Sequence, residues 1–94
     1  MSIDQTTKII RNPGTLATNV DKDMIILNMA TNHYVALDEI GQRIWDLIEN
    51  PTQVSAVCAQ LASEYSGDAE QINADVLAFL SELVDESLAH LVEA

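Results

Sequence analysis

The sequence predicts an α+β domain in which a three-stranded antiparallel sheet precedes three helices. Residues before position 38 are rich in Thr, Ile, Val and Asn, whereas later residues are rich in Ala, Leu, Glu and Gln at helical spacing. The charge changes at the same point, because residues 1–37 carry three acids and three bases and residues 38–94 carry twelve acids and one base. A chain of 94 residues has room for one domain, residues 1–94, of which residues 1–14 are expected to be a flexible N-terminal segment.

Three segments are predicted to be the strands of one meander. Thr15–Val20 alternates loosely between apolar and polar residues, and Met24–Met29 is an apolar run with β-branched residues. His33–Leu37 follows at hairpin distance, so it is expected to pair with the preceding run in the antiparallel sense. The last strand of a meander is an edge strand, which exposes unpaired N–H and C=O groups.

The first two helices are predicted from their ends. Asp38 is the expected N-cap of a helix that reaches Asn50, and Thr52 is the expected N-cap of a second helix that ends near Gly67. Gly41 lies inside the first helix, at a cost of roughly 1 kcal/mol relative to Ala. We therefore expect a strand or another helix to approach Gly41 closely.

The third predicted helix begins at Asp68 and has an apolar stripe wider than one packed face needs. The stripe consists of Ile72, Val76, Phe79, Leu80 and Leu83, with Leu77 and Val84 beside it. Such a helix lies between two layers or lines a groove, although a wide stripe is more often simply core. The last apolar residues, within 88–92, are expected to form a short strand or turn.

The composition disfavours several kinds of partner. The chain has 15 acidic and 4 basic residues, hence a net charge of −11. Nucleic acids and anionic membranes both require clustered Lys and Arg, so neither is an expected partner. No stretch approaches the roughly 18 apolar residues of a membrane span. The first ten residues, MSIDQTTKII, lack the layout of a signal peptide, so a cytoplasmic location is expected.

The residues that carry catalytic or metal chemistry are few and scattered. His33 and His90 have no second His or Cys at the spacing of zinc ligands. Cys58 lies on the apolar side of the second helix, which predicts a buried and inert thiol. The three Gly residues are isolated and form no phosphate-binding loop. We therefore expect no catalytic residue, no metal and no cofactor, and we do not expect an enzyme.

Three features remain: an edge strand at His33–Leu37, an over-apolar third helix and a strongly acidic helical half. Together they suggest a groove with an open strand on one wall, an apolar helix on the other and negative charge around it. Such a groove suits an extended basic peptide that adds to the sheet as an extra strand.

The segment that follows the expected hairpin resembles a known family. Residues 33–48 read HYVALDEIGQRIWDLI, and the usual family form is a strand pair followed by L-N/D-x-x-G-x-x-I/V-W-x-L. On these residues the chain resembles the PqqD-like family, also called RiPP recognition elements, from about Leu16 to Val92. One departure is visible at residues 86–88, where Glu-Ser-Leu stands in place of the Arg-Gly-Leu of many members.

The resemblance implies a winged-helix-like domain of three strands and three helices. In this family the third strand and third helix form a cleft, in which the leader segment of a ribosomally made precursor peptide lies as an added antiparallel strand. Carried over by position, the strand wall is His33, Tyr34, Val35, Ala36 and Leu37, and the helix wall is Asn73, Val76, Leu77, Leu80, Leu83 and Val84. A register shift of one residue swaps the two faces of a strand, so groove and core residues are not separated in this list.

The resemblance also implies a second partner, a separate enzyme that modifies the precursor. In lasso-peptide clusters this enzyme is a leader peptidase with a cyclase downstream, and the compact hairpin–Gly–Trp pattern favours this type. The alternative of the same class is a chaperone for a radical SAM enzyme, as in pyrroloquinoline quinone synthesis.

Two alternatives come from other classes of protein. A winged-helix transcription factor would need Lys and Arg in its recognition helix, and residues 68–94 contain neither. A general acidic protein–protein adaptor would bind a folded partner and would show no preference for an isolated leader peptide.

Overall fold

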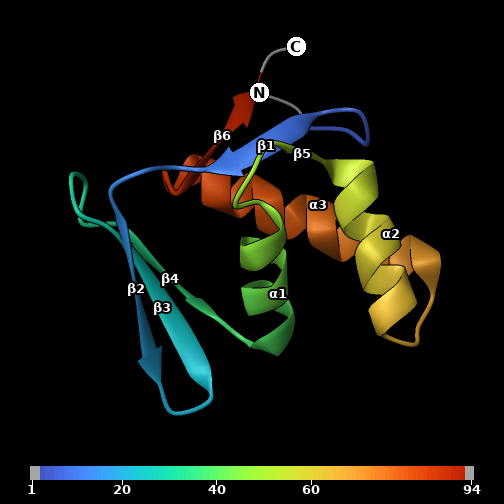
Figure 1. The fold of residues 1–94 in the computed structure, drawn as a ribbon, viewed down its shortest axis with the longest axis horizontal. Coiled ribbons are helices and arrows are strands. Elements are labelled where there is room, and N and C mark those ends of the chain that lie inside the picture. Colours follow the sequence, from blue (N-terminus) through green and yellow to red (C-terminus); the bar gives the residue numbers. More distant parts are fainter. Residues whose placement is uncertain (1–2, 93–94) are drawn as a thin grey trace.

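Two three-stranded antiparallel sheets and three helices form the structure, a computed structural model that describes residues 3–92 (Figure 1). The elements run in the order β1 (Lys8–Arg11), β2 (Thr15–Val20), β3 (Asp23–Asn28), β4 (Tyr34–Leu37), α1 (Glu39–Leu47), β5 (Thr52–Gln53), α2 (Val54–Glu64), α3 (Ala69–Asp85) and β6 (Ala89–Val92). The predicted α+β class is confirmed. The predicted meander of three strands is present, and a second sheet accompanies it.

The meander has the strand order β2–β3–β4, so β4 is an edge strand as expected. Leu27 of β3 pairs with Leu16 on one side and with Tyr34 on the other, and these rows set the register of the whole sheet. Burial alternates along β4, since Val35 and Leu37 are buried while the residues between and before them are exposed. This alternation has the period of two that one buried face of a sheet requires.

The second sheet has the order β5–β1–β6 and corrects the expectation of a flexible segment at residues 1–14. Lys8–Arg11 pair with β6 along their whole length, and Ile9 has no exposed surface. Residues 1 and 2 lie outside the described part of the chain. The strand was not predicted because its partners, β5 and β6, are distant in sequence, and the local sequence pattern does not indicate this pairing. The expected strand or turn at the end of the chain is β6.

The helix N-caps agree with the sequence at two of three positions, while α1 ends at Leu47 and not at the expected Asn50. The carboxylate of Asp38 accepts a hydrogen bond from the backbone N–H of Gly41 at 2.8 Å, and Asp68 caps α3 in the same manner. The expected cap at Thr52 is wrong. Thr52 belongs to β5, its hydroxyl donates to the carbonyl of Leu47 at 2.9 Å, and α2 begins two residues later.

Gly41 sits where α1 crosses the end of β4. A Cβ atom at this position would lie 3.3 Å from the Cβ of Leu37, which is tighter than an ordinary contact. The close approach that the sequence predicted at Gly41 is therefore confirmed. One turn later, Trp45 is buried in the core, so Gly41 and Trp45 together seat α1 against the sheet.

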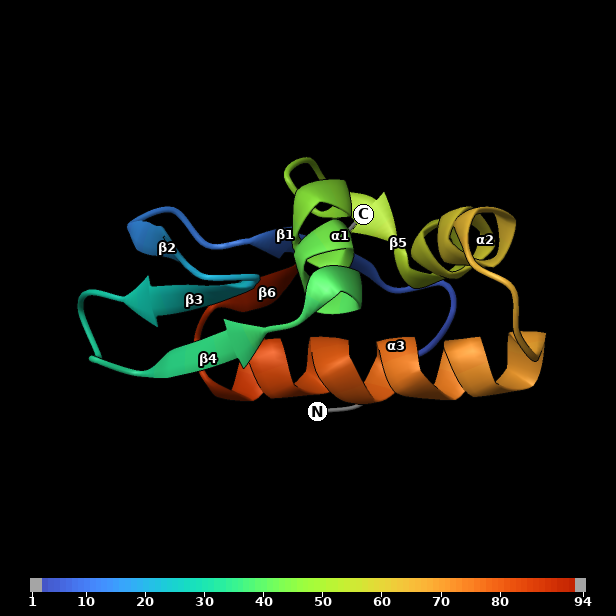
Figure 2. The ribbon, with the colours of Figure 1, turned by 90° about the horizontal axis from the view of Figure 1, so that it is seen from below.

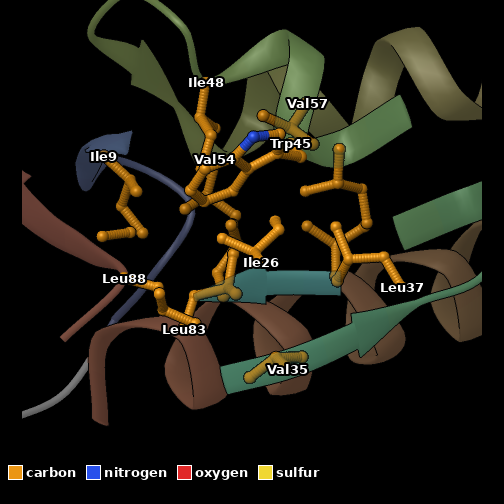
Figure 3. Packing of buried hydrophobic residues seen from close by; sticks show 14 of the residues in the cluster. Ile9, Ile26, Val35, Leu37, Trp45, Ile48, Val54, Val57, Leu83 and Leu88 are labelled. Atoms are coloured by element: carbon orange, nitrogen blue, oxygen red, sulfur yellow. The ribbon is translucent and has the colours of Figure 1, made fainter. Parts of the chain in front are cut away.

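The hydrophobic core lies between the two sheets and the three helices (Figure 3). The labelled side chains come from every layer, with Ile9 from β1, Ile26 from β3, Val57 from α2 and Leu83 from α3. Each fully buried aliphatic side chain contributes about 1.5–3 kcal/mol. Cys58 is also buried in this core, as its position on the helix predicted. Within residues 3–92, none of the helices combines the length and the apolar character needed to cross a bilayer.

Candidate functional site

The outer edge of β4 exposes backbone groups that pair with nothing in residues 3–92. The backbone N–H of Asn28 donates to the carbonyl of His33 at 2.8 Å, so this pair is a hydrogen-bonded one. Bonded and non-bonded pairs alternate along an antiparallel ladder, so Val35 also directs its N–H and C=O toward β3. Tyr34 and Ala36 therefore direct theirs toward the free edge, where another strand can add.

A cleft of about 320 Å³ lies beside this edge, between β4 and α3. Figure 2 shows α3 running along the side of the sheet that ends in β4. The lining of this β4–α3 cleft comes from the start of β3, from β4 and the cap that follows it, and from the middle of α3. It consists of Asp23, Val35, Ala36, Leu37, Asp38, Phe79 and Glu82.

A second cavity, of about 260 Å³, lies where α1, α2 and α3 meet. It shares Asp38 and Phe79 with the β4–α3 cleft, so the two hollows adjoin. Its lining is mainly apolar and consists of Asp38, Ile40, Gly41, Ile44, Leu61, Tyr65, Ile72, Asp75, Val76 and Phe79. An extended peptide that occupied both hollows would meet carboxylates in the β4–α3 cleft and mainly apolar side chains in the second cavity.

The charged residues that line the cleft are all acidic. Asp23, Asp38 and Glu82 contribute carboxylates, and no Lys or Arg belongs to the lining. Asp38 is also committed to its helix cap, which leaves Asp23 and Glu82 as the carboxylates open to a ligand. Within residues 3–92, no three His, Cys, Asp or Glu side chains are grouped so that they could hold a metal ion. The cleft is therefore suited to cationic organic groups.

The largest pKa shift lies away from this cleft. The guanidinium of Arg43 and the amide of Gln60 donate to the carboxylate of Glu64 and lower its pKa from 4.5 to about 2. The pair joins α1 to α2 on the surface, and the Arg43 N to Glu64 O distance is 2.7 Å. Its role is to connect two helices.

The residue before β4 and the last residue of β3 contact the end of α3 and the turn after it. The imidazole of His33 lies 3.2 Å from the carboxylate of Glu86, the residue that ends α3. The next residue, Ser87, has a φ of 60° and its carbonyl accepts hydrogen bonds from the side-chain amides of Asn12 and Asn28. The two amides therefore bind a residue that has a side chain yet adopts the left-handed conformation.

The predicted site residues fall into three groups. Val35, Leu37, Val76, Leu80 and Leu83 are buried in the core; Asn73, Leu77 and Val84 are half-buried; His33, Tyr34 and Ala36 are exposed. The cleft lining includes Val35, Ala36 and Leu37 of the strand wall, while Val76 lines the adjoining cavity. Which of these residues contact a ligand stays a prediction.

Four residues of the lining were absent from the predicted walls: Asp23, Asp38, Phe79 and Glu82. Phe79 belonged to the apolar stripe of the third helix, and Glu82 follows it by three residues on the same helical face. A helical projection aligned on Phe79 could have found both. Asp23 carries no local signal, since it reaches the cleft only through the pairing of β3 with β4.

Residues 23–89 match the protein family described as Coenzyme PQQ synthesis protein D (PqqD). A PqqA binding protein of Rhodopseudomonas palustris strain BisB5 is 36% identical over 58 residues, which are 62% of this chain and 57% of that protein. The corresponding protein of strain ATCC BAA-98 / CGA009 is 34% identical over the same shares. The chain thus matches less than two thirds of the length of these curated relatives.

Two solved structures have the same fold. The structure of TbiB1 in complex with the TbiA(beta) leader peptide superposes with a TM-score of 0.76 at 25% identity, covering 90% of this chain and 99% of that one. Lasso peptide synthetase B1, complexed with its leader peptide, superposes with a TM-score of 0.74 at 20% identity, covering 87% and 96%.

Proposed function

The chain belongs to the PqqD family, and from this premise we propose that it binds the leader segment of a ribosomally made precursor peptide and delivers it to a modifying enzyme. The leader lies as an added antiparallel strand on the free edge of β4, within the β4–α3 cleft. The chain itself performs no chemistry, and its role is to hold the precursor near the enzyme, which raises the local concentration of the segment to be modified.

The observation that carries this proposal is the free edge of β4 beside the cleft. Tyr34 and Ala36 each present an N–H and a C=O there, so an extended peptide can form backbone hydrogen bonds without any requirement on its sequence. The cleft lies along the same edge, so every second side chain of the added strand faces Phe79 and Glu82 of α3.

Selectivity comes from the two adjoining hollows. An apolar side chain of the leader fits against Phe79, and a Lys or Arg of the leader lies near Asp23 or Glu82. The net charge of −11 attracts a basic leader over a distance set by the ionic strength, about 10 Å at 0.1 M salt. The association rate should therefore fall as salt is added.

The enzyme partner that we favour is the leader peptidase of lasso-type biosynthesis. The fold shared with lasso peptide synthetase B1, over 96% of that chain, favours the lasso type. The second candidate is a radical SAM enzyme of pyrroloquinoline quinone synthesis, which the matches to PqqA binding proteins favour. A general acidic adaptor would use neither the edge of β4 nor the cleft.

The experiment is a fluorescence anisotropy titration with a labelled leader peptide from the nearest short open reading frame of the same gene neighbourhood. We expect saturable binding with a Kd on the order of 1 μM that weakens between two salt concentrations. A folded chain that shows no saturable binding would move the assignment to a protein–protein adaptor.

A matched pair of proline variants tests the mode of binding. Ala36→Pro removes an N–H from the free edge of β4 and leaves the β3–β4 ladder intact. The same alternation places the N–H of Ala17 on the free edge of β2, so Ala17→Pro makes the same change on the opposite side of the sheet. We expect Ala36→Pro to raise the Kd by about tenfold or more and Ala17→Pro to leave it within about twofold. Equal effects of the two variants would contradict strand addition at β4.

A further inference from the structure

The face of the β2–β3–β4 sheet that points away from the core is apolar and open. The register places eight side chains on it, Asp23 among them, and the seven uncharged ones are called the outer face below. It consists of Leu16, Thr18, Val20, Ile25, Leu27, Tyr34 and Ala36. Leu16, Val20 and Tyr34 are among the exposed large hydrophobic residues, with 49%, 46% and 66% of their surface accessible.

No part of the described chain covers the outer face. Ile26 and Val35 point to the opposite side of the sheet, into the core. The helices lie on that core side, and the other side of the sheet is open in Figure 1. Contiguous apolar surface of this kind on a small chain marks a site of protein association.

The charge of the chain argues against a second copy as the occupant. The seven residues of the outer face carry no charge, Asp23 beside Val20 is the one acidic residue that the register adds on this side, and residues 1–37 are neutral overall. The chain as a whole carries −11, so pairing two copies brings two strongly negative molecules together. A partner of different composition, with a neutral apolar patch and neutral or basic surroundings, avoids this repulsion.

The position of the outer face indicates which protein binds there. The face ends at β4, the strand whose free edge receives the leader peptide under the proposed function. A strand added there lies about 4.8 Å from β4 and presents alternate side chains on the same face. A protein seated on the outer face therefore lies directly beside the bound peptide.

We propose that the outer face is the docking surface for the precursor-modifying enzyme, a separate protein that contacts β2, β3 and β4 through its own apolar patch. This inference rests on the proposed function and goes beyond it, because it assigns the enzyme a surface that shares only Ala36 with the lining of the β4–α3 cleft. Peptide and enzyme then bind the same sheet side by side, the peptide at the edge of β4 and the enzyme on the outer face.

The test uses the double variant Leu16→Thr with Val20→Thr, both on β2 and two strands away from the peptide edge. Thr retains the preference for a strand while removing apolar surface. The control is Met29→Thr, which removes a 63% exposed hydrophobic side chain from the turn between β3 and β4. Thermal unfolding shows that each variant is folded. Biolayer interferometry then measures binding of the purified modifying enzyme encoded in the same gene neighbourhood, and anisotropy measures binding of the labelled leader.

We expect the double variant to bind the leader with a Kd within about twofold of the wild-type value and to bind the enzyme about tenfold or more weakly. The Met29→Thr control should bind both as the wild type does. Wild-type enzyme affinity in the double variant would overturn the inference while leaving leader binding intact. So would a wild-type dimer in sedimentation that the double variant converts to monomer. Loss of leader binding by the wild-type chain would instead refute the proposed function.

Discussion

The side-chain amide of Asn28 donates a hydrogen bond to the backbone carbonyl of Ser87 at 2.5 Å. This bond joins the last residue of β3 to the turn that follows α3. The two walls of the β4–α3 cleft belong to these two parts of the chain. The bond therefore ties the sheet that contains β4 to the end of α3, through residues 59 positions apart in sequence.

Replacement of Asn28 by Asp should remove the hydrogen bond to Ser87 and keep the other hydrogen bonds of the side chain. The Oδ1 atom of Asn28 accepts hydrogen bonds from the N–H groups of Ala30 and Thr31, and a carboxylate preserves these bonds. The donor to Ser87 is lost, so we expect the free energy of unfolding to fall by about 1–2 kcal/mol in urea titrations and leader affinity to weaken. Unchanged values of both would show that the bond does not set the cleft.

Ser87→Gly should stabilise the chain. Ser87 has a φ of 60°, a conformation that costs an L-residue with a Cβ about 1–2 kcal/mol and that Gly adopts freely. Part of this gain is offset by the larger entropy of Gly in the unfolded chain. We expect a net increase of about 0.5–1 kcal/mol in the free energy of unfolding. Ser87→Ala is the control, since it keeps the Cβ atom and should give no increase.

Leu80→Ala and Leu77→Ala should distinguish core from surface on α3. Leu80 has no exposed surface, whereas Leu77 is half-buried. We expect Leu80→Ala to lower the free energy of unfolding by about 2–4 kcal/mol because it leaves a cavity. The effect of Leu77→Ala should be smaller. Equal losses in chemical denaturation would contradict the orientation of the helix.

The Arg43–Glu64 pair should make stability depend on pH at the acid end. The pKa of Glu64 is lowered from 4.5 to about 2 in the folded chain, so the unfolded chain binds the proton more readily. The contribution of the pair is therefore complete above about pH 4.5 and is lost as the pH falls toward 2. The difference in melting temperature between wild type and Glu64→Gln should shrink from pH 7 to pH 2.5. A difference that stays constant over this range would contradict the assignment.

Much of the fold follows from local patterns. The meander, the three helices, the caps at Asp38 and Asp68 and the close contact at Gly41 depend on residues near one another in sequence. Strand β1 did not follow, because Lys8–Arg11 becomes a strand only by pairing with β5 and β6. Thr52 is a residue type that often caps helices, but here it pairs with Ile9 and therefore belongs to β5.

The sequence by itself determined the order of strands and helices, the acidity of the helical half and the edge position of the strand at residues 34–37. Only the tertiary structure decided which side of that strand is buried and which residues of α3 meet it. Strand faces have a period of two, so a register shift of one residue would have exchanged Val35 and Ala36. The cleft lining of Asp23, Phe79 and Glu82 likewise exists only after β3, β4 and α3 have packed, because contacts between distant segments have no local pattern in the chain.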